Sequence, residues 1–229
     1  MSQTNLPVMI FAAGFGTRMG ALTATLPKPL IKVAGRPLID YALDIAAPRN
    51  VVVNTHYKAD QLAAHLAPRA NVHISHEPDI LETGGGLRRA RPLLANSTVL
   101  TLNSDAIWAG PNPLDLLAMS WDPAHMDALM LMIPLPHMVG PTRNGDFRLN
   151  DDGTLTRDPG GQVYTGAQIV KIDELENFKE PAFSLNKLWN KLEKRGTLFG
   201  QTYAGKIADV GTPEGIGLAE NLLDTSHHA

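Results

Sequence analysis

Strand-like and helix-like segments alternate through the first half of the chain. In chain order, the strand-like runs rich in Val, Ile and Leu and the segments with apolar residues at helical spacing are 7–13 (strand), 36–48 (helix), 50–56 (strand), 58–68 (helix), 71–75 (strand), 83–94 (helix) and 97–105 (strand). This alternation is typical of a parallel sheet with helices on both faces. It predicts an α/β fold with a doubly wound sheet, in which the helix at 83–94 begins after its glycines.

The pattern changes in the second half, where short strand-like segments are separated by turn signals. These segments are 127–135, 145–150, 153–157 and 162–172. Asp and Gly between 150 and 154 favour a hairpin turn. We expect a smaller antiparallel or mixed layer over one end of the sheet. The segments expected after it are a helix near 184–196, a strand pair within 197–211 and a last helix from Pro213 to Leu223.

The length of 229 residues suits one large α/β domain. Apolar residues make up 44% of the chain and charged residues 19%, which is ordinary for a globular protein. We therefore expect a single domain over 1–229. Because the sequence contains no cysteine, disulfides, thiolate zinc sites and a cysteine nucleophile are excluded.

The formal net charge is −3, and the sequence has none of the basic clusters that bind duplex DNA or an acidic membrane. The apolar run at 128–133 is far shorter than the roughly 20 residues that cross a bilayer. The N-terminal stretch also lacks the basic residue that opens a signal peptide. We expect a cytoplasmic protein that binds neither nucleic acid nor membrane, and whose phosphate ligands are small.

The first strand-like run leads into AAGFGTRM, residues 12–19, and LPKPLIKVAGRPLI follows at 26–39. An apolar strand, a glycine-rich turn and spaced basic residues indicate a loop that holds an anion. The P-loop pattern G-x-x-x-x-G-K-[ST] does not fit this spacing. The dinucleotide pattern G-x-G-x-x-G fails at Met19, and no acidic residue ends the next strand.

Together, the two stretches closely resemble the signature of the sugar-1-phosphate nucleotidyltransferases, which make nucleoside diphosphate sugars. That signature is an apolar strand ending in A-[AG]-G, followed by G-T-R-[LM], P-K-P-[LM] and V-x-G-x-P. The resemblance implies a Rossmann-like nucleotide-diphospho-sugar transferase fold with a mixed sheet and a small sugar-binding subdomain. It implies a nucleotide-binding half at about 1–110 and a sugar-binding half at about 111–229.

The chemistry of this reaction accounts for the spacing. Transfer at the α-phosphorus needs no covalent protein intermediate, so catalysis comes from alignment and from neutralising phosphate charge. Backbone N–H groups from Gly14 to Thr17 reach a triphosphate only where no Cβ blocks the approach. The guanidinium of Arg18 matches two oxygens of the departing pyrophosphate. Lys28, held between prolines, supplies a point charge to the α-phosphate or the sugar phosphate. Arg18 and Lys28 are the predicted catalytic residues.

Asp105 and Asp209 each end a strand-like segment. In the resembled family these positions hold magnesium on the triphosphate. Mg²⁺ keeps several waters, so two carboxylates and phosphate oxygens are enough for it. The resemblance therefore implies Mg²⁺ as the cofactor, although Ser104 stands where relatives commonly have glycine.

Other site residues are also implied by the resemblance. The expected contacts of the nucleoside triphosphate are Ala12, Ala13, Gly14, Gly16, Thr17, Asn54, Glu82, Thr83 and Gly84. Those of the sugar 1-phosphate are Asn103, Gly145, Asp146, Thr165, Gly166, Asn186 and Lys187. A purely structural interpretation remains open for several of them, with Thr83 as a helix cap beside loop glycines.

Several short segments narrow the resemblance. ETGGG, RNGDFRLN, YTGAQIV, FSLNKLW and DVGT are similar to segments of the uridylyltransferases that act on N-acetylmuramate 1-phosphate in peptidoglycan recycling. The E-K-P motif of many hexose-1-phosphate thymidylyl- and guanylyltransferases is missing. UTP is therefore the favoured nucleotide. The alternatives are a mannose-1-phosphate guanylyltransferase, a glucose-1-phosphate thymidylyl- or uridylyltransferase and, in another class, a nucleotide-sugar-binding regulator without turnover.

Muramic acid carries a lactyl carboxylate that a hexose phosphate lacks, so a nearby cation is expected to recognise it. Arg143, Arg148 and Lys187 are the candidates, and the sequence does not choose among them. It also leaves the oligomeric state open.

Overall fold

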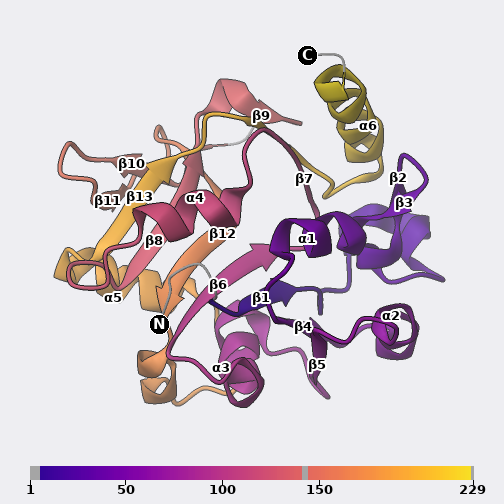
Figure 1. Ribbon diagram of the computed structural model, residues 1–229, viewed down its shortest axis with the longest axis horizontal. Coiled ribbons are helices and arrows are strands. Elements are labelled where there is room, and N and C mark those ends of the chain that lie inside the picture. The colour runs from indigo at the N-terminus through magenta and orange to yellow at the C-terminus, as the bar shows by residue number, and fades with distance from the viewer. Residues whose placement is uncertain (1–5, 141–143, 228–229) are drawn as a thin grey trace.

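The structure is a computed structural model that describes residues 6–140 and 144–227. Its centre is a seven-stranded mixed sheet with the spatial order β13-β8-β12-β6-β1-β4-β5 (Figure 1). The four strands from β6 to β5 are parallel, β12 is antiparallel to both of its neighbours, and β13 is parallel to β8. The strands of this sheet are β1 (Val8–Phe11), β4 (Val51–Thr55), β5 (Val72–His76), β6 (Thr98–Asn103), β8 (Ala128–Ile133), β12 (Val163–Lys171) and β13 (Leu198–Thr202).

Helices cover both faces of this sheet. Val8 and Ile10 pack in the apolar layer of α1, α2 and α4, whereas Met9 between them packs in the layer of α3 and α5. This alternation along β1 is what a strand buried on both faces requires. The α-helices are α1 (Leu38–Ala46), α2 (Ala59–Leu66), α3 (Glu82–Leu94), α4 (Pro113–Ser120), α5 (Asn186–Arg195) and α6 (Pro213–His227). The 3₁₀ helices are η2 (Thr17–Thr23), η3 (Lys28–Leu30), η4 (Leu135–His137) and η5 (Asp173–Asn177).

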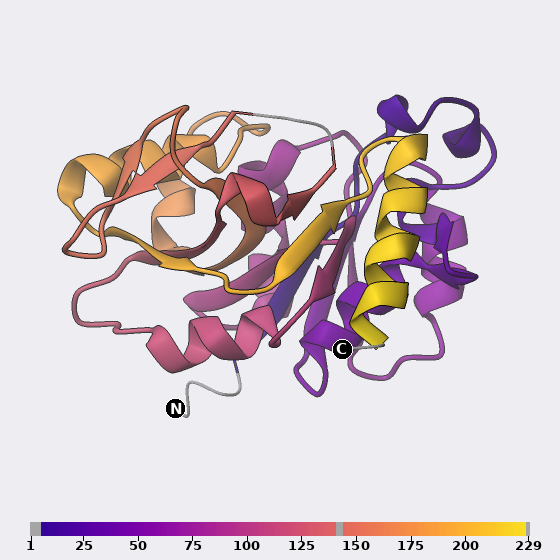
Figure 2. The same cartoon turned by 90° about the horizontal axis from the view of Figure 1, so that it is seen from above.

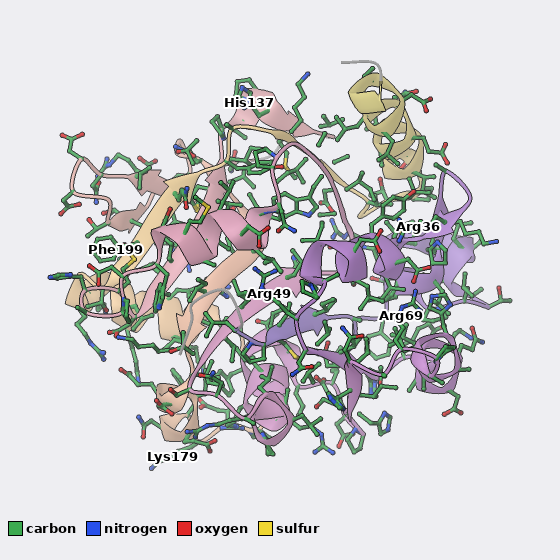
Figure 3. The ribbon with its side chains drawn as sticks, in the orientation of Figure 1. Arg36, Arg49, Arg69, His137, Lys179 and Phe199 are labelled. Atoms are coloured by element: carbon green, nitrogen blue, oxygen red, sulfur yellow. The ribbon has the colours of Figure 1, made fainter. Side chains whose placement is uncertain are left out.

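Ion pairs join the helices α1, α2 and α4, which cover one face of the central sheet. Arg69, just after α2, donates to the largely buried Asp40 of α1 at 2.7 Å. Arg49, which is 4% exposed, donates to Asp115 of α4 at 2.5 Å. The two arginines lie at separate places along this layer (Figure 3). Their contacts hold α1 against both of its helical neighbours.

Three smaller sheets complete the fold. One has the order β7-β14-β9 and carries α6 on its surface (Figure 2). The other two are the pairs β10-β11 and β2-β3. Their strands are β2 (Lys32–Val33), β3 (Arg36–Pro37), β7 (Ala106–Ala109), β9 (Met138–Val139), β10 (Phe147–Leu149), β11 (Leu155–Arg157) and β14 (Lys206–Asp209). Within the described ranges, no helix has the length and apolar character needed to span a membrane.

The α/β class and the mixed sheet predicted from the sequence are confirmed, but two predictions about the second half are wrong. The separate layer forms only in part: β10 and β11 make a small antiparallel pair, but β8 and β12 extend the central sheet, because β12 pairs antiparallel with β6. The expected strand pair in 197–211 does not form either. Its first strand, β13, pairs with β8, and its second strand, β14, pairs with β7 and β9.

The prediction that the helix at 83–94 begins after its glycines is also wrong. Helix α3 begins at Glu82, so Gly84, Gly85 and Gly86 lie inside its first two turns. A Cβ on Gly84 would lie 2.4 Å from the ring of Phe183, and one on Gly86 would lie 2.5 Å from a carboxylate oxygen of Glu77. Close packing thus explains the glycines, which cost a helix roughly 1 kcal/mol each relative to alanine.

Candidate active site

A pocket of about 330 Å³ opens where the strand order of the central sheet reverses. From β1 the chain runs outward to β4 and β5, and then returns through α3 to β6 on the other side of β1. Ligands of open α/β sheets bind outside the carboxyl ends of the strands at such a reversal. The lining residues are Phe11, Ala12, Ala13, Gly14, Gly16, Thr17, Arg18, Lys28, Pro29, Asn54, Glu77, Ile80, Glu82, Thr83, Asn103, Ser104, Asp105 and Gly211.

Most residues predicted for the nucleotide and for catalysis line this pocket, but the predicted sugar residues, with one exception, do not. The predicted residues in the lining are Ala12, Ala13, Gly14, Gly16, Thr17, Arg18, Lys28, Asn54, Glu82, Thr83, Asn103 and Asp105. Those outside it are Gly84, Gly145, Asp146, Thr165, Gly166, Asn186, Lys187 and Asp209.

The glycine loop begins directly after β1 and packs on Lys28. Gly16 has a φ of +65°, and a Cβ there would lie 2.9 Å from the Cβ of Lys28. A left-handed conformation and a close neighbour both require glycine at this position. The carbonyl of Gly16 accepts from the N–H of Met19 and from the hydroxyl of Thr23, which closes the turn into η2. Three residues of this loop, Gly14, Gly16 and Thr17, line the pocket.

Lys28 and Asp105 meet inside the pocket although 77 positions separate them in the sequence. The ammonium of Lys28 donates to Asp105 Oδ2 at 2.5 Å, and the side chains are 12% and 27% exposed. Lys28 is the first residue of η3, between Pro27 and Pro29, and this turn fixes its backbone. The carboxylate of Asp105 is therefore already paired with the ammonium of Lys28 in this pocket.

The backbones of Asp105 and Asp209 run side by side. Asp209 pairs with Ala106 in the β7-β14 ladder, and Val210 N–H donates to the carbonyl of Asp105 at 2.8 Å. Only Asp105 belongs to the lining, however. Among the described residues, no cluster of three or more His, Cys, Asp or Glu is arranged as a metal site. The Asp105 carboxylate, which accepts a hydrogen bond from the Lys28 ammonium, is a hard oxygen donor of the kind that Mg²⁺ prefers, and Mg²⁺ needs few protein ligands.

Arg18 is exposed at the edge of the pocket, beside the turn that follows β14. A Cβ on Gly211 would lie 3.1 Å from the Arg18 guanidinium, so glycine leaves room for the arginine there. The segment DVGT is thus placed against the basic residue of the opening signature.

A buried polar chain forms the floor beneath the glycine loop. Asn54 Oδ1 accepts from the N–H of Ala12 at 2.7 Å, and its amide nitrogen donates to Glu77 Oε1 at 2.7 Å. Glu77 is fully buried, and its other oxygen accepts from the N–H of Leu81 at 3.0 Å. These bonds fix the ends of β1 and β4 relative to the start of α3. Sequence reasoning missed Glu77, whose only signal was an acidic residue just after a strand and before a proline.

The start of α3 is attached to the segment before α5. The N–H groups of Gly84 and Gly85 both donate to the carbonyl of Phe183, at 2.8 and 3.1 Å. The hydroxyl of Thr83 accepts from the N–H of Leu185 at 3.0 Å. The Thr83 hydroxyl thus joins two distant segments of the chain and does not cap α3, the helix in which it lies. Gly84 packs under Phe183 and lies outside the pocket lining.

Asn103 links the pocket to the other residues predicted for the sugar. Gly166 has a φ of +87°, and a Cβ there would lie 2.6 Å from the Asn103 amide nitrogen. The neighbouring Thr165 is buried, and its hydroxyl donates to the carbonyl of Leu131. Glycine at 166 therefore lets β12 approach the end of β6 closely.

The other sugar-side residues lie around the β10-β11 pair and the start of α5. Asp146 accepts from the N–H of Tyr164 at 2.9 Å, and Gly145 donates to the carbonyl of Pro159. Burial raises the pKa of the Tyr164 phenol. Asn186 donates to Ser184 at 2.9 Å. The structure keeps these groups in one region of the second half.

The three cations predicted for a lactyl carboxylate differ in their surroundings. Lys187 pairs with Glu180 at 2.7 Å, and Arg148 lies 3.5 Å from Asp158. Both side chains are exposed. Arg143 lies outside the described residues.

The glycine loop and the contact between Lys28 and Asp105 thus lie together at the sheet reversal, the place where open α/β sheets bind their ligands. Residues 8–142 match the MobA-like NTP transferase domain. The chain belongs to this family and is a nucleotidyltransferase.

Two relatives match almost the whole chain. The N-acetylmuramate alpha-1-phosphate uridylyltransferase of Caulobacter vibrioides is 37% identical over 97% of this chain and 99% of that protein. The protein of the same name from Neisseria meningitidis serogroup B is 32% identical over 90% of this chain and 94% of that protein. Among solved structures, a UDP-glucose pyrophosphorylase complexed with UDP-glucose has a TM-score of 0.77 at 17% identity, covering 96% of this chain and 99% of the other. At 17% identity, this similarity shows that the two proteins share a fold and nothing more.

Proposed function

We propose that this protein transfers UMP from UTP to N-acetylmuramate 1-phosphate, with release of pyrophosphate and formation of the UDP-sugar. One observation carries the proposal: the similarity to the Caulobacter uridylyltransferase extends over both halves of the chain, including the segments assigned to the sugar. The pocket at the sheet reversal supports the nucleotide part of the proposal.

In this proposal, the residues around the pocket have separate roles in binding and catalysis. Backbone N–H groups at 14–17 bind the triphosphate, and Arg18 binds the pyrophosphate that leaves. Lys28 neutralises the α-phosphate or the sugar phosphate as the new bond forms. Asp105 and Asp209 would hold Mg²⁺, which supplies positive charge on the phosphate oxygens. The contact between Lys28 and Asp105 supports these roles. It holds the lysine ammonium beside the proposed metal ligand, where phosphate oxygens of the substrates would compete with the Asp105 carboxylate for it.

The sugar lies, in this proposal, between the end of β6 and the β10-β11 pair. Asn103 borders both the pocket and Gly166, so it joins the nucleotide side to the sugar side. The other proposed contacts of the sugar are Gly145, Asp146, Thr165, Asn186 and Lys187.

The test is pyrophosphate release over a grid of substrates. UTP, GTP, dTTP and CTP are each combined with the 1-phosphates of N-acetylmuramate, N-acetylglucosamine, glucose and mannose, with Mg²⁺ and with EDTA. We expect the highest kcat/KM for UTP with N-acetylmuramate 1-phosphate, and loss of turnover in EDTA.

Other outcomes decide between the alternatives. A preference for GTP with mannose 1-phosphate, or for dTTP or UTP with glucose 1-phosphate, would keep the reaction and replace the substrates. Nucleotide binding without pyrophosphate release for any pair would identify a binding module instead.

A further inference from the structure

The lactyl carboxylate separates N-acetylmuramate from N-acetylglucosamine, and its recognition requires a cation near the sugar. This step rests on the proposed function. Among the described cations in the second half, Lys187 and Arg148 already face carboxylates, those of Glu180 and Asp158. A ligand carboxylate would have to compete with these acidic side chains, whereas a cation with neutral hydrogen-bond partners is open to it.

The guanidinium of Arg157 makes its hydrogen bonds to neutral groups, whereas the backbone N–H of this residue donates to Glu193 at 2.9 Å. Its Nη2 donates to the side-chain oxygen of Asn186 and, at 3.4 Å, to that of Asn190. Within the described ranges these are the hydrogen bonds of its guanidinium, and they leave Nη1 and Nε available to a ligand. The side chain is exposed. An arginine held by amide oxygens retains its charge for an incoming anion.

Aromatic rings fix the orientation of this guanidinium. The Arg157 Cζ lies 4.2 Å from the ring centroid of Phe147 and 5.8 Å from that of Trp189. Phe147 is fully buried, and Trp189 donates its indole N–H to Gln168 at 3.0 Å. Partial burial lowers the pKa of Arg157, and the charges of Glu193 and Asp146 oppose that shift. The guanidinium is thus positioned before any ligand arrives, which reduces the entropy lost on binding.

Arg157 also lies between residues assigned to the sugar. In the β10-β11 register it pairs with Phe147, which directly follows Asp146. Its partner Asn186 begins α5, and the preceding residue, Leu185, donates to Thr83 in the pocket lining. A path of direct contacts therefore connects the guanidinium to the nucleotide pocket.

We infer that Arg157 binds the lactyl carboxylate of N-acetylmuramate 1-phosphate and so selects this sugar over N-acetylglucosamine 1-phosphate. The planar guanidinium matches the two oxygens of a carboxylate in a way that an ammonium does not. Arg157 is a specificity residue in this assignment and takes no part in the bond-forming step.

The experiment compares the two sugars in one assay. It measures the KM of N-acetylmuramate 1-phosphate with saturating UTP and Mg²⁺, and the inhibition constant of N-acetylglucosamine 1-phosphate against it. In Arg157→Gln, we expect KM to rise about ten- to a hundredfold, since a charge-assisted hydrogen bond is lost. The inhibition constant of N-acetylglucosamine 1-phosphate and the KM of UTP should stay unchanged, because neither ligand carries the lactyl group.

Two further variants complete the series. Arg157→Lys should give an intermediate KM, because it keeps the charge and loses the planar fork. Arg195→Gln is the matched control. Arg195 is the last residue of α5, the helix that Asn186 begins, and it pairs with Glu174 at 2.6 Å. It should leave both constants unchanged.

The outcomes separate this inference from the proposed function. Equal increases in both constants, or no increase in either, would overturn the role of Arg157 while the wild-type activity still supports the proposed function. If the wild-type protein makes no product from N-acetylmuramate 1-phosphate, both the proposed function and this inference fall.

Discussion

At the scale of single residues, the structure brings most of the residues predicted for the nucleotide and for catalysis to one pocket, and it shows contacts between them that the sequence did not predict. The glycine loop, Lys28 and Asp105 all line one pocket. The bond between Lys28 and Asp105 joins segments that no local pattern connects. Glu77 was missed for a related reason, because its importance comes from burial beneath Asn54, and burial depends on the packing of the whole sheet.

Arg18→Ala is expected to lower kcat/KM for pyrophosphate release by about ten- to a hundredfold. The reason is that charge-assisted hydrogen bonds are typically worth about 1.5–3 kcal/mol, and the exposed guanidinium at the pocket edge contributes little to the core. Steady-state kinetics measure the effect. Arg91→Ala serves as control, because Arg91 pairs with Asp173 on the surface at 2.5 Å. Wild-type kinetics in Arg18→Ala would remove this residue from the mechanism.

At the scale of elements, periodicity predicted the strands and helices of the first half, because each lies within a few consecutive residues. The predicted start of α3 was wrong because glycine normally weakens a helix. Here Phe183, Pro181 and Glu77 come so close that larger residues do not fit. The partners of β13 and β14 were also wrong, since strand pairing depends on contacts between distant segments.

Two helical glycines should respond to alanine in opposite directions. Gly84→Ala places a methyl group 2.4 Å from the Phe183 ring and should destabilise the protein by about 1–3 kcal/mol. Gly217→Ala in α6 meets no atom within 4 Å and should stabilise it by about 0.5–1 kcal/mol. Urea unfolding measures both changes. A stabilised Gly84→Ala would show that α3 does not pack on Phe183 in this way.

A charged group ties three elements together and predicts a pH dependence. Asp127, just before β8, accepts from Lys171 at the end of β12 at 2.9 Å and from Arg195 at the end of α5 at 3.2 Å. Burial raises the pKa of Asp127, but hydrogen bonds led by that from Lys171 outweigh burial and hold the pKa below its ordinary value. A lowered pKa stabilises the folded state above the unfolded value, and this contribution is lost as the pH falls through the folded value.

Asp127→Asn should therefore cost about 0.5–1 kcal/mol at neutral pH, a magnitude typical of a partly exposed ion pair. The difference from wild type should shrink between about pH 5 and pH 3, where the wild-type carboxylate takes up its proton. Urea unfolding of both proteins across this range checks the expectation. A penalty that is the same at every pH would show that charge is not the cause.

At the scale of the whole molecule, the two halves share one sheet. β12 from the second half pairs with β6 from the first, with Gln168 opposite Thr101, and the sheet continues through β8 to β13. The sequence predicted the doubly wound half but placed these later strands in a separate layer. Local patterns do not reveal that an antiparallel strand will add to the edge of a parallel sheet.

This shared sheet predicts one cooperative unfolding transition. Far-UV circular dichroism reports on the whole chain, and tryptophan fluorescence reports on Trp108 in the first half and on Trp121 and Trp189 in the second. We expect the two signals to change at the same urea concentration. Separate transitions would indicate that the halves unfold independently, against the expectation of a single domain.

The attachment of α3 to the segment before α5 limits how this protein can be recombined. Thr83 and Gly84 belong to the first half of the chain, whereas Phe183 and Leu185 belong to the second half. A chimera that takes its second half from a relative with a different residue at 183 would set an unmatched side chain against Gly84. Exchanges of substrate specificity therefore need to transfer both sides of this contact together.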